Sequence, residues 1–166
     1  MESSGPTVPD KVKQNLDNAT FYVLHPGELV FRFADSSPKD RPFLGYQASP
    51  WWYREREFLI LMARAKSSSL GLLQVRLDAA VLQSWSKMDV SVRATVRRQM
   101  DAWMGTPRTQ SEVAPNGMQI TMPGCFDIQQ LFIPDITDAS GMLTYYGRTA
   151  LSVEETQPLN VPQLWK

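Results

Sequence analysis

Three adjacent aromatic residues, Trp51, Trp52 and Tyr53, constrain the fold of this chain more than any other feature of its sequence. They follow Ser49 and a proline, and serine is a preferred helix N-cap while proline is favoured at the first helical position. The sequence therefore predicts a helix that begins at Ser49 and continues to about residue 65. Three consecutive large rings cannot all lie on one face of a helix. We expect one or two of them to pack in the core, and the remaining ring to be available to a flat ligand.

Two strands are expected before that helix, at residues 21–25 and 28–34, on either side of a Pro-Gly turn. In the second strand Arg32 alternates with Phe31 and Phe33, which places the arginine on the opposite face of the sheet. An arginine in this position either pairs with a nearby acidic side chain or grips a phosphate with its planar fork.

The rest of the pattern predicts an α+β fold. We expect a helix at 10–18 capped by Asp10, a strand at 70–77, and a short helix or turn at 79–85. A further helix is expected to begin near Asp89 and to bury Val92, Val96, Met100 and Trp103. Strands are expected at 118–122, 128–133 and 143–146, and whether the last one continues to 151 stays open. Because helices and strands do not alternate regularly, the sheets are expected to be mainly antiparallel. The expected organisation is an N-terminal arm at 1–20 and a single domain at 21–166.

The composition argues against several classes of protein. Lys+Arg and Asp+Glu both number 17, so no net charge directs the chain to nucleic acid or to an anionic membrane. The single Cys125 excludes an intramolecular disulfide, and the lone His25 argues against a His/Cys metal cluster. The sequence contains neither an apolar run of about 18 residues nor the pattern of a signal peptide. We expect folding in the cytoplasm, so that delivery into another cell would need a specialised secretion system.

A late strand with polar side chains is a further candidate for function. Asp127 and Gln129 share one face of the segment 127–134, and Ile128 and Gln130 share the other. An ordinary half-exposed strand would show the same alternation. The sequence lacks the standard phosphate-binding loop, the dinucleotide-binding glycine motif, zinc-binding motifs and the nucleophile elbow.

Taken in order, residues 29–32, 49–52 and 130–134 resemble the ADP-ribosyltransferase superfamily, in particular small bacterial toxin domains and their NAD-degrading relatives. The resemblance implies two mainly antiparallel sheets that form a cleft, with helices packed alongside. It also implies a set of site residues: Arg32, Ser49, Trp51, Trp52 and Tyr53 for NAD binding, and Arg32, Ser49, Gln130 and Asp127 for catalysis.

One departure from the family concerns Gln130, because the family has its catalytic glutamate at this position. If the alignment holds, Asp127 or Glu55 must supply the carboxylate, or the chain binds NAD without turning it over. An uncharged amide hydrogen-bonds a ribose hydroxyl but does not balance developing positive charge.

The activity implied by the resemblance is cleavage of the nicotinamide–ribose bond of NAD, with transfer of ADP-ribose to a protein or RNA acceptor or to water. The loop at 35–48 is expected to choose the acceptor. Such a transferase would be a bacterial effector used in interbacterial competition, with a cognate immunity protein as its partner. Two alternatives remain open from the sequence: a non-catalytic interaction module, such as an immunity protein, chaperone or adaptor, and a hydrolase of another kind.

Overall fold

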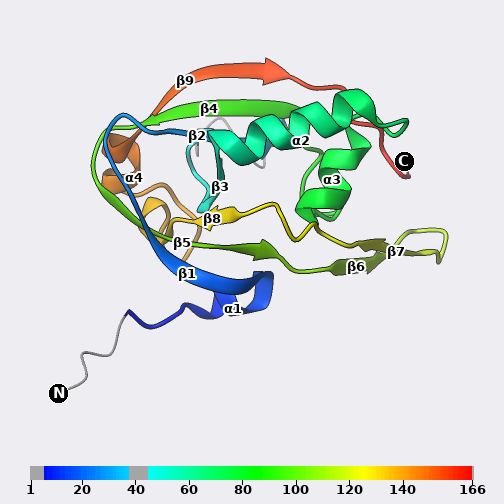
Figure 1. Ribbon diagram of the computed structural model, residues 1–166, viewed down its shortest axis with the longest axis horizontal. Coiled ribbons are helices and arrows are strands. Elements are labelled where there is room, and N and C mark those ends of the chain that lie inside the picture. Colours follow the sequence, from blue (N-terminus) through cyan, green and yellow to red (C-terminus); the bar gives the residue numbers. More distant parts are fainter. Residues whose placement is uncertain (1–5, 38–44, 166) are drawn as a thin grey trace.

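The computed structural model describes residues 6–37 and 45–165 (Figure 1). Its elements in chain order are α1 (Asp10–Asn15), β1 (Leu16–Leu24), β2 (Leu29–Ala34), β3 (Trp51–Arg54), α2 (Glu55–Ser67), α3 (Leu73–Ala79), β4 (Val90–Val96), β5 (Met100–Pro107), β6 (Gln110–Val113), β7 (Gln119–Met122), β8 (Gln130–Phe132), η1 (Pro134–Ile136), α4 (Tyr145–Ala150) and β9 (Leu151–Pro158). The loop expected to choose an acceptor lies partly outside the described residues.

The described strands form a seven-stranded sheet in the order β1-β5-β8-β3-β2-β4-β9 and a separate β6-β7 hairpin. Every pairing is antiparallel. The predicted α+β class is therefore confirmed, with one large sheet, one small sheet and helices packed alongside. β3 is the central strand and joins the β1-β5-β8 half of the sheet to the β2-β4-β9 half.

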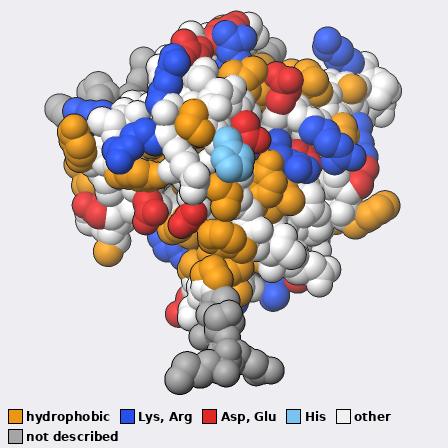
Figure 2. All heavy atoms as spheres, turned by 60° about the vertical axis from the view of Figure 1, so that its left-hand side comes forward, with side chains coloured by type: hydrophobic (Ala, Val, Ile, Leu, Met, Phe, Trp, Pro, Cys, Tyr) orange, Lys and Arg blue, Asp and Glu red, His pale blue; other side chains and the backbone are white. Residues whose placement is uncertain are grey.

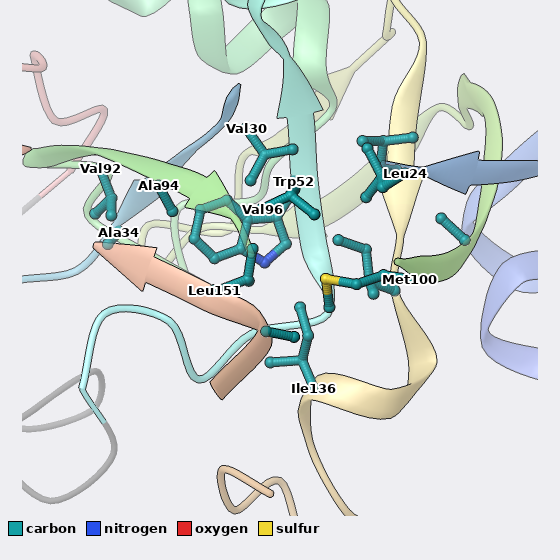
Figure 3. Close-up of a cluster of buried hydrophobic side chains, with 14 of the residues drawn as sticks. Leu24, Val30, Ala34, Trp52, Val92, Ala94, Val96, Met100, Ile136 and Leu151 are labelled. Carbon is teal, nitrogen blue, oxygen red and sulfur yellow. The ribbon is translucent and has the colours of Figure 1, made fainter. Parts of the chain in front are cut away.

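The principal core gathers side chains from both halves of the large sheet around Trp52 (Figure 3). Val30 and Ala34 of β2 contribute to it, as does Met100 of β5. A second core lies under α2 and α3 and contains Phe33 and Tyr53. The central strands therefore carry apolar side chains on both faces, which is typical of a sheet that is buried between two layers.

The alternation predicted for β2 is confirmed. Phe31 stacks on Phe58 of α2 with ring centroids 4.3 Å apart, and Phe33 belongs to the core beneath α2. Arg32 lies on the other side of the strand, with its guanidinium 5.9 Å from the ring centroid of Trp52.

The helix predicted from Ser49 begins later than expected. Residues 51–54 form β3, and α2 starts at Glu55 with Arg54 at its N-cap. Ser49 is therefore not a helix cap, and its hydroxyl accepts a hydrogen bond from the backbone N–H of Trp51 at 3.1 Å. Pairing of this segment with β8 and β2 satisfies its backbone groups and buries Trp52, which outweighs the local capping signal.

The helix predicted from Asp89 is wrong, because this region forms the strands β4 and β5. Val92, Val96 and Met100 are buried, as expected. A spacing of four residues is typical of a helix but is also a multiple of the two-residue period of a strand. The valine-rich sequence of β4 favours the strand, since branched side chains pack well on a pleated sheet.

Three smaller predictions are also corrected. The strand at 70–77 is replaced by α3, whose residues Val75 and Ala79 pack in the core beneath α2. The strand expected to begin at residue 143 is instead α4 followed by β9, and the Thr144 hydroxyl caps α4 by accepting from the Gly147 N–H at 2.9 Å. The first helix ends at Asn15 without a side-chain cap from Asp10, and β1 then runs across position 20.

The burial of Trp52 generates a prediction about stability. Its side chain is inaccessible to solvent, and its indole N–H donates to the Ser49 carbonyl at 2.6 Å. We expect Trp52→Ala to lower the free energy of unfolding by about 3–5 kcal/mol, as for other buried aromatic side chains. Urea denaturation measures this loss, with Trp51→Ala as the matched control because Trp51 is only partly buried. Equal losses for the two variants would contradict a special role for Trp52 in the core.

Candidate functional site

A pocket of about 200 Å³ lies where β2, β3, β8 and the end of β5 adjoin. Its aromatic lining consists of Phe33, Trp51, Tyr53 and Trp85. Its polar and charged lining consists of Asn15, Arg32, Ser49, Ser86, Arg108, Gln110 and Gln130. The described lining thus contains two arginines and neither an aspartate nor a glutamate.

The structure brings together five of the residues singled out from the sequence. Arg32, Ser49, Trp51, Tyr53 and Gln130 all line this pocket, although they come from segments up to about a hundred residues apart. The order of strands explains the convergence, because β2 and β8 lie on either side of β3 in the sheet. Trp52 is not part of the lining, because its ring is enclosed in the principal core.

Arg32 is held firmly at the pocket. It is 8% exposed, and its Nη1 donates to the backbone carbonyl of Tyr46 at 2.7 Å. Its guanidinium also lies over the ring of Trp52. A guanidinium fixed in this way is preorganised for an anion, but the same contacts give Arg32 a part in folding as well.

Gln130 and Tyr53 form a hydrogen-bonded pair across neighbouring strands. The Gln130 Nε2 donates to the Tyr53 hydroxyl at 3.1 Å. Tyr53 is almost fully buried, and this burial raises the pKa of its phenol, so the hydroxyl stays protonated at neutral pH. The pair therefore presents an oriented, uncharged amide to the pocket.

Ser49 shapes the corner that precedes β3. Its hydroxyl accepts from the Trp51 N–H at 3.1 Å, and its carbonyl accepts from the Trp52 indole at 2.6 Å. These two bonds fix where Trp51 enters the pocket lining. Ser49 therefore acts on the shape of the pocket through the backbone of β3.

The structure does not bring Asp127 or Glu55 into the pocket lining. Asp127 forms an ion pair with Arg64 and accepts a hydrogen bond from the Cys125 thiol at 2.8 Å. The hydrogen bond from Arg64 lowers the pKa of Asp127. Glu55 is exposed in the first turn of α2. Neither carboxylate therefore lies beside Gln130 in the described pocket lining.

Among the lining residues that were not expected from the sequence are one arginine and one tryptophan. Arg108 follows β5, and its Nε lies 3.0 Å from an Asp17 carboxylate oxygen. Trp85 is an indole that is 44% exposed, in the segment between α3 and β4. The sequence signal for Trp85 was a large aromatic residue within the polar run 83–87. No sequence signal pointed to Arg108.

The chemistry of the pocket fits an anionic ligand that carries flat rings. Guanidinium groups bind phosphate, aromatic faces stack on bases, and amides hydrogen-bond hydroxyl groups. The residues that the structure describes hold no group of three or more His, Cys, Asp or Glu side chains suited to a metal ion. None of the described helices has the length and apolar character needed to span a membrane. Figure 2 shows acidic and basic side chains interspersed over one face of the molecule, in line with the equal numbers of the two.

Comparison with known proteins identifies similarity at the level of the fold. No protein-family model matches the sequence, and no curated protein matches it either. The structure is similar to that of Rhs1-CT in complex with its cognate immunity protein RhsI1, with a TM-score of 0.51, 15% identity, and coverage of 86% of this chain and 83% of the other. It is also similar to Tne2 in complex with Tni2, with a TM-score of 0.49, 10% identity, and coverage of 89% and 98%. The first similarity shows a shared fold.

The ion pair between Asp127 and Arg64 generates a prediction about how stability depends on pH. Because the pKa of this carboxylate is lowered in the folded state, its stabilising contribution is present above its ordinary pKa of about 3.9 and is lost as pH falls through the lowered value. We expect Asp127→Asn to cost at most about 1 kcal/mol at pH 7, since the pair with Arg64 is partly exposed. Urea denaturation at pH 7 and at low pH should show that the difference from the wild type disappears in acid. A difference that persists there would contradict the assignment.

Proposed function

We propose that the pocket binds NAD and that this chain is a toxin-type domain that cleaves the nicotinamide–ribose bond. The observation that carries the proposal is the convergence of Arg32, Trp51, Tyr53 and Gln130 on one pocket. Each of these residue types matches one part of a dinucleotide, which combines a charged pyrophosphate, flat rings and ribose hydroxyls.

In the proposed complex, Arg32 binds the pyrophosphate through its planar fork, and Arg108 adds a second positive charge to the pocket. Trp51 and Tyr53 provide the surface on which the nicotinamide or the adenine rests. Gln130, oriented by the Tyr53 hydroxyl, hydrogen-bonds a ribose hydroxyl. Ser49 holds the corner that positions Trp51.

In the reaction, the bond between the nicotinamide nitrogen and the ribose anomeric carbon lengthens and then breaks. The bonding electron pair leaves with nicotinamide, which departs neutral, and the ribose becomes an oxocarbenium-like cation. Attack by water on the anomeric carbon makes the protein an NAD hydrolase, and attack by a protein or RNA group makes it an ADP-ribosyltransferase. Gln130 offers this cation only the partial charge of an amide oxygen, so we expect binding to be more effective than turnover.

The biological role is proposed from the fold. Rhs1-CT, whose fold this chain shares, is known in complex with a cognate immunity protein. We propose that this chain is likewise an effector in competition between bacteria, that a specialised secretion system delivers it, and that a cognate immunity protein protects the producing cell.

One observation favours a second candidate function, a non-catalytic binding module. The described lining of the pocket has no carboxylate to stabilise the developing cation. A protein of this kind would bind a nucleotide or a protein segment in the same pocket without cleaving a bond. The two experiments below separate the candidates.

Arg32 tests NAD binding. We expect Arg32→Ala to weaken NAD binding by about 1.5–3 kcal/mol, the scale of a hydrogen bond to a charged group. It should also lower the melting temperature, because the bond to the Tyr46 carbonyl and the contact with Trp52 are lost. Isothermal titration calorimetry measures the affinity, and Arg97→Ala is the matched control because Arg97 pairs with Glu154 and does not line the pocket. Equal affinity of the wild type and Arg32→Ala would contradict the assigned role.

Gln130 tests catalysis. A carboxylate at this position would stabilise the ribosyl cation by about 3–4 kcal/mol, so we expect Gln130→Glu to raise the rate of NAD cleavage by a factor of hundreds. Release of nicotinamide is the measurement. Gln129→Glu is the matched control, because the Gln129 amide binds the Thr106 hydroxyl at 3.1 Å and lies outside the pocket lining. NAD binding without cleavage by either form would favour the binding module, and no NAD binding at all would rule out the proposed substrate.

A further inference from the structure

The segment 81–87, between α3 and β4, contributes a distinct part of the pocket. Val81, Trp85 and Ser86 all belong to the lining. The segment contains no regular helix or strand, so its shape depends on contacts with the rest of the protein. Hydrogen bonds to the backbone hold both of its ends.

A single buried arginine ties the two ends of this segment together. Arg76 of α3 is inaccessible to solvent, and its Nη1 donates to the Val81 carbonyl at 3.2 Å. Its Nη2 donates to the Lys87 carbonyl, also at 3.2 Å. Val81 and Lys87 are the first and last residues of the segment, so one guanidinium holds its two ends together.

The backbone is strained on either side of the same segment. Ala80 and Met88 have φ values of 53° and 54°, in the left-handed region that is unfavourable for residues with a side chain. Such residues are unfavourable and persist only where the surroundings determine the conformation. Both are buried. The segment is therefore held in one shape against a local preference, as occurs often at binding sites.

Three more hydrogen bonds fix the segment from outside. The Asp35 carboxylate accepts from the Lys87 N–H at 3.0 Å. The Gln83 side chain donates to the Trp165 carbonyl at 2.9 Å and accepts from the Leu164 N–H at 2.6 Å. The last residue of the segment therefore contacts the residue that follows β2, and its middle contacts the C-terminal residues.

Folding alone gives little reason for an arginine at position 76. Burial lowers the pKa of its guanidinium, and its Nε has no hydrogen-bond partner among the described residues. An apolar side chain of similar volume would usually be as stabilising as a buried charge. The arginine does supply what an apolar residue lacks, two donors at a fixed separation that match two carbonyls.

We propose that Arg76 is a positioning residue that holds Trp85 at the rim of the pocket, where the indole stacks on a ring of the bound dinucleotide. The inference rests on the proposed function and adds a ring-binding residue to it. Trp85 keeps 44% of its surface exposed, whereas the neighbouring Leu82 and Met88 are buried and anchor the segment on either side. Trp85 is thus presented to solvent from a rigid support, as a binding residue requires.

The test combines NAD titration with hydrogen exchange of the segment 81–87. We expect Trp85→Ala to weaken NAD binding about 5- to 150-fold, the range for loss of one base–aromatic stack. Tyr145→Ala is the matched control, because Tyr145 is 80% exposed and lies outside the pocket lining. Arg76→Met keeps the side-chain volume but removes both donors, and it should speed amide exchange in the segment and also weaken NAD binding.

The double variant tests whether Arg76 acts through Trp85. If it does, Arg76→Met should weaken NAD binding much less in the Trp85→Ala background than in the wild type. Losses that multiply independently would overturn the positioning role. Unchanged amide exchange of the segment in Arg76→Met would also overturn the positioning role. Wild-type affinity for NAD in Trp85→Ala would overturn the contact between the indole and the bound ring.

Ala80→Gly keeps the proposal testable if Arg76→Met does not fold. Glycine adopts a φ of 53° without strain but also has a more flexible backbone, and these two effects oppose each other in stability. The variant should therefore keep its melting temperature while the segment becomes more mobile and NAD binding weakens. A purely structural role would move melting temperature and affinity together, and that result would overturn the proposal. If the wild-type protein binds no NAD but amide exchange is still faster in Arg76→Met, the proposed substrate is wrong. The role of Arg76 in holding the segment 81–87 would then stand.

Discussion

The two halves of the large sheet meet on β3, and the position of this four-residue strand depends on how Trp52 is buried. The Trp52 ring fills the principal core, which draws side chains from both halves, and its indole N–H is bonded to the Ser49 carbonyl. Because side chains alternate along a strand, the burial of Trp52 directs Trp51 and Tyr53 to the opposite face. One buried side chain therefore supports the joint between the halves and also the aromatic part of the pocket.

Arg32 in the pocket lining and Arg76 in α3 both hold the backbone through their guanidinium groups. Arg32 donates to the Tyr46 carbonyl, and Arg76 donates to the carbonyls of Val81 and Lys87. Both are buried cations whose donors hold backbone segments that border or form the site. Removing charge from water is costly, and contacts of this kind favour a defined geometry more than they favour stability. The pocket is thus organised by interactions that a core built only for stability would not need.

The elements that differ from their local sequence signals do so for a common physical reason. Val92, Val96 and Met100 were correctly placed in the core, but their spacing fits a helix and a strand equally well. Pairing of β4 with β2 and β9, and of β5 with β1 and β8, selected two strands. Ser49 carried a genuine helix-start signal that was overridden when residues 51–54 paired with β8 and β2. Local propensities differ by amounts that a row of interstrand hydrogen bonds and buried side chains readily exceeds.

The sequence by itself determined the alternation of β2, which separates Arg32 from Phe31 and Phe33, and the α+β class, because both follow from the order and period of apolar residues. It also required that the adjacent tryptophans divide between core and site. Tertiary structure alone decided which tryptophan is buried, and it alone brought Gln130 beside Tyr53 and placed Asp127 with Arg64 instead of in the pocket lining. These outcomes depend on which distant strands become neighbours. Strand order is set by the packing of the whole chain, and no local pattern of residues encodes it.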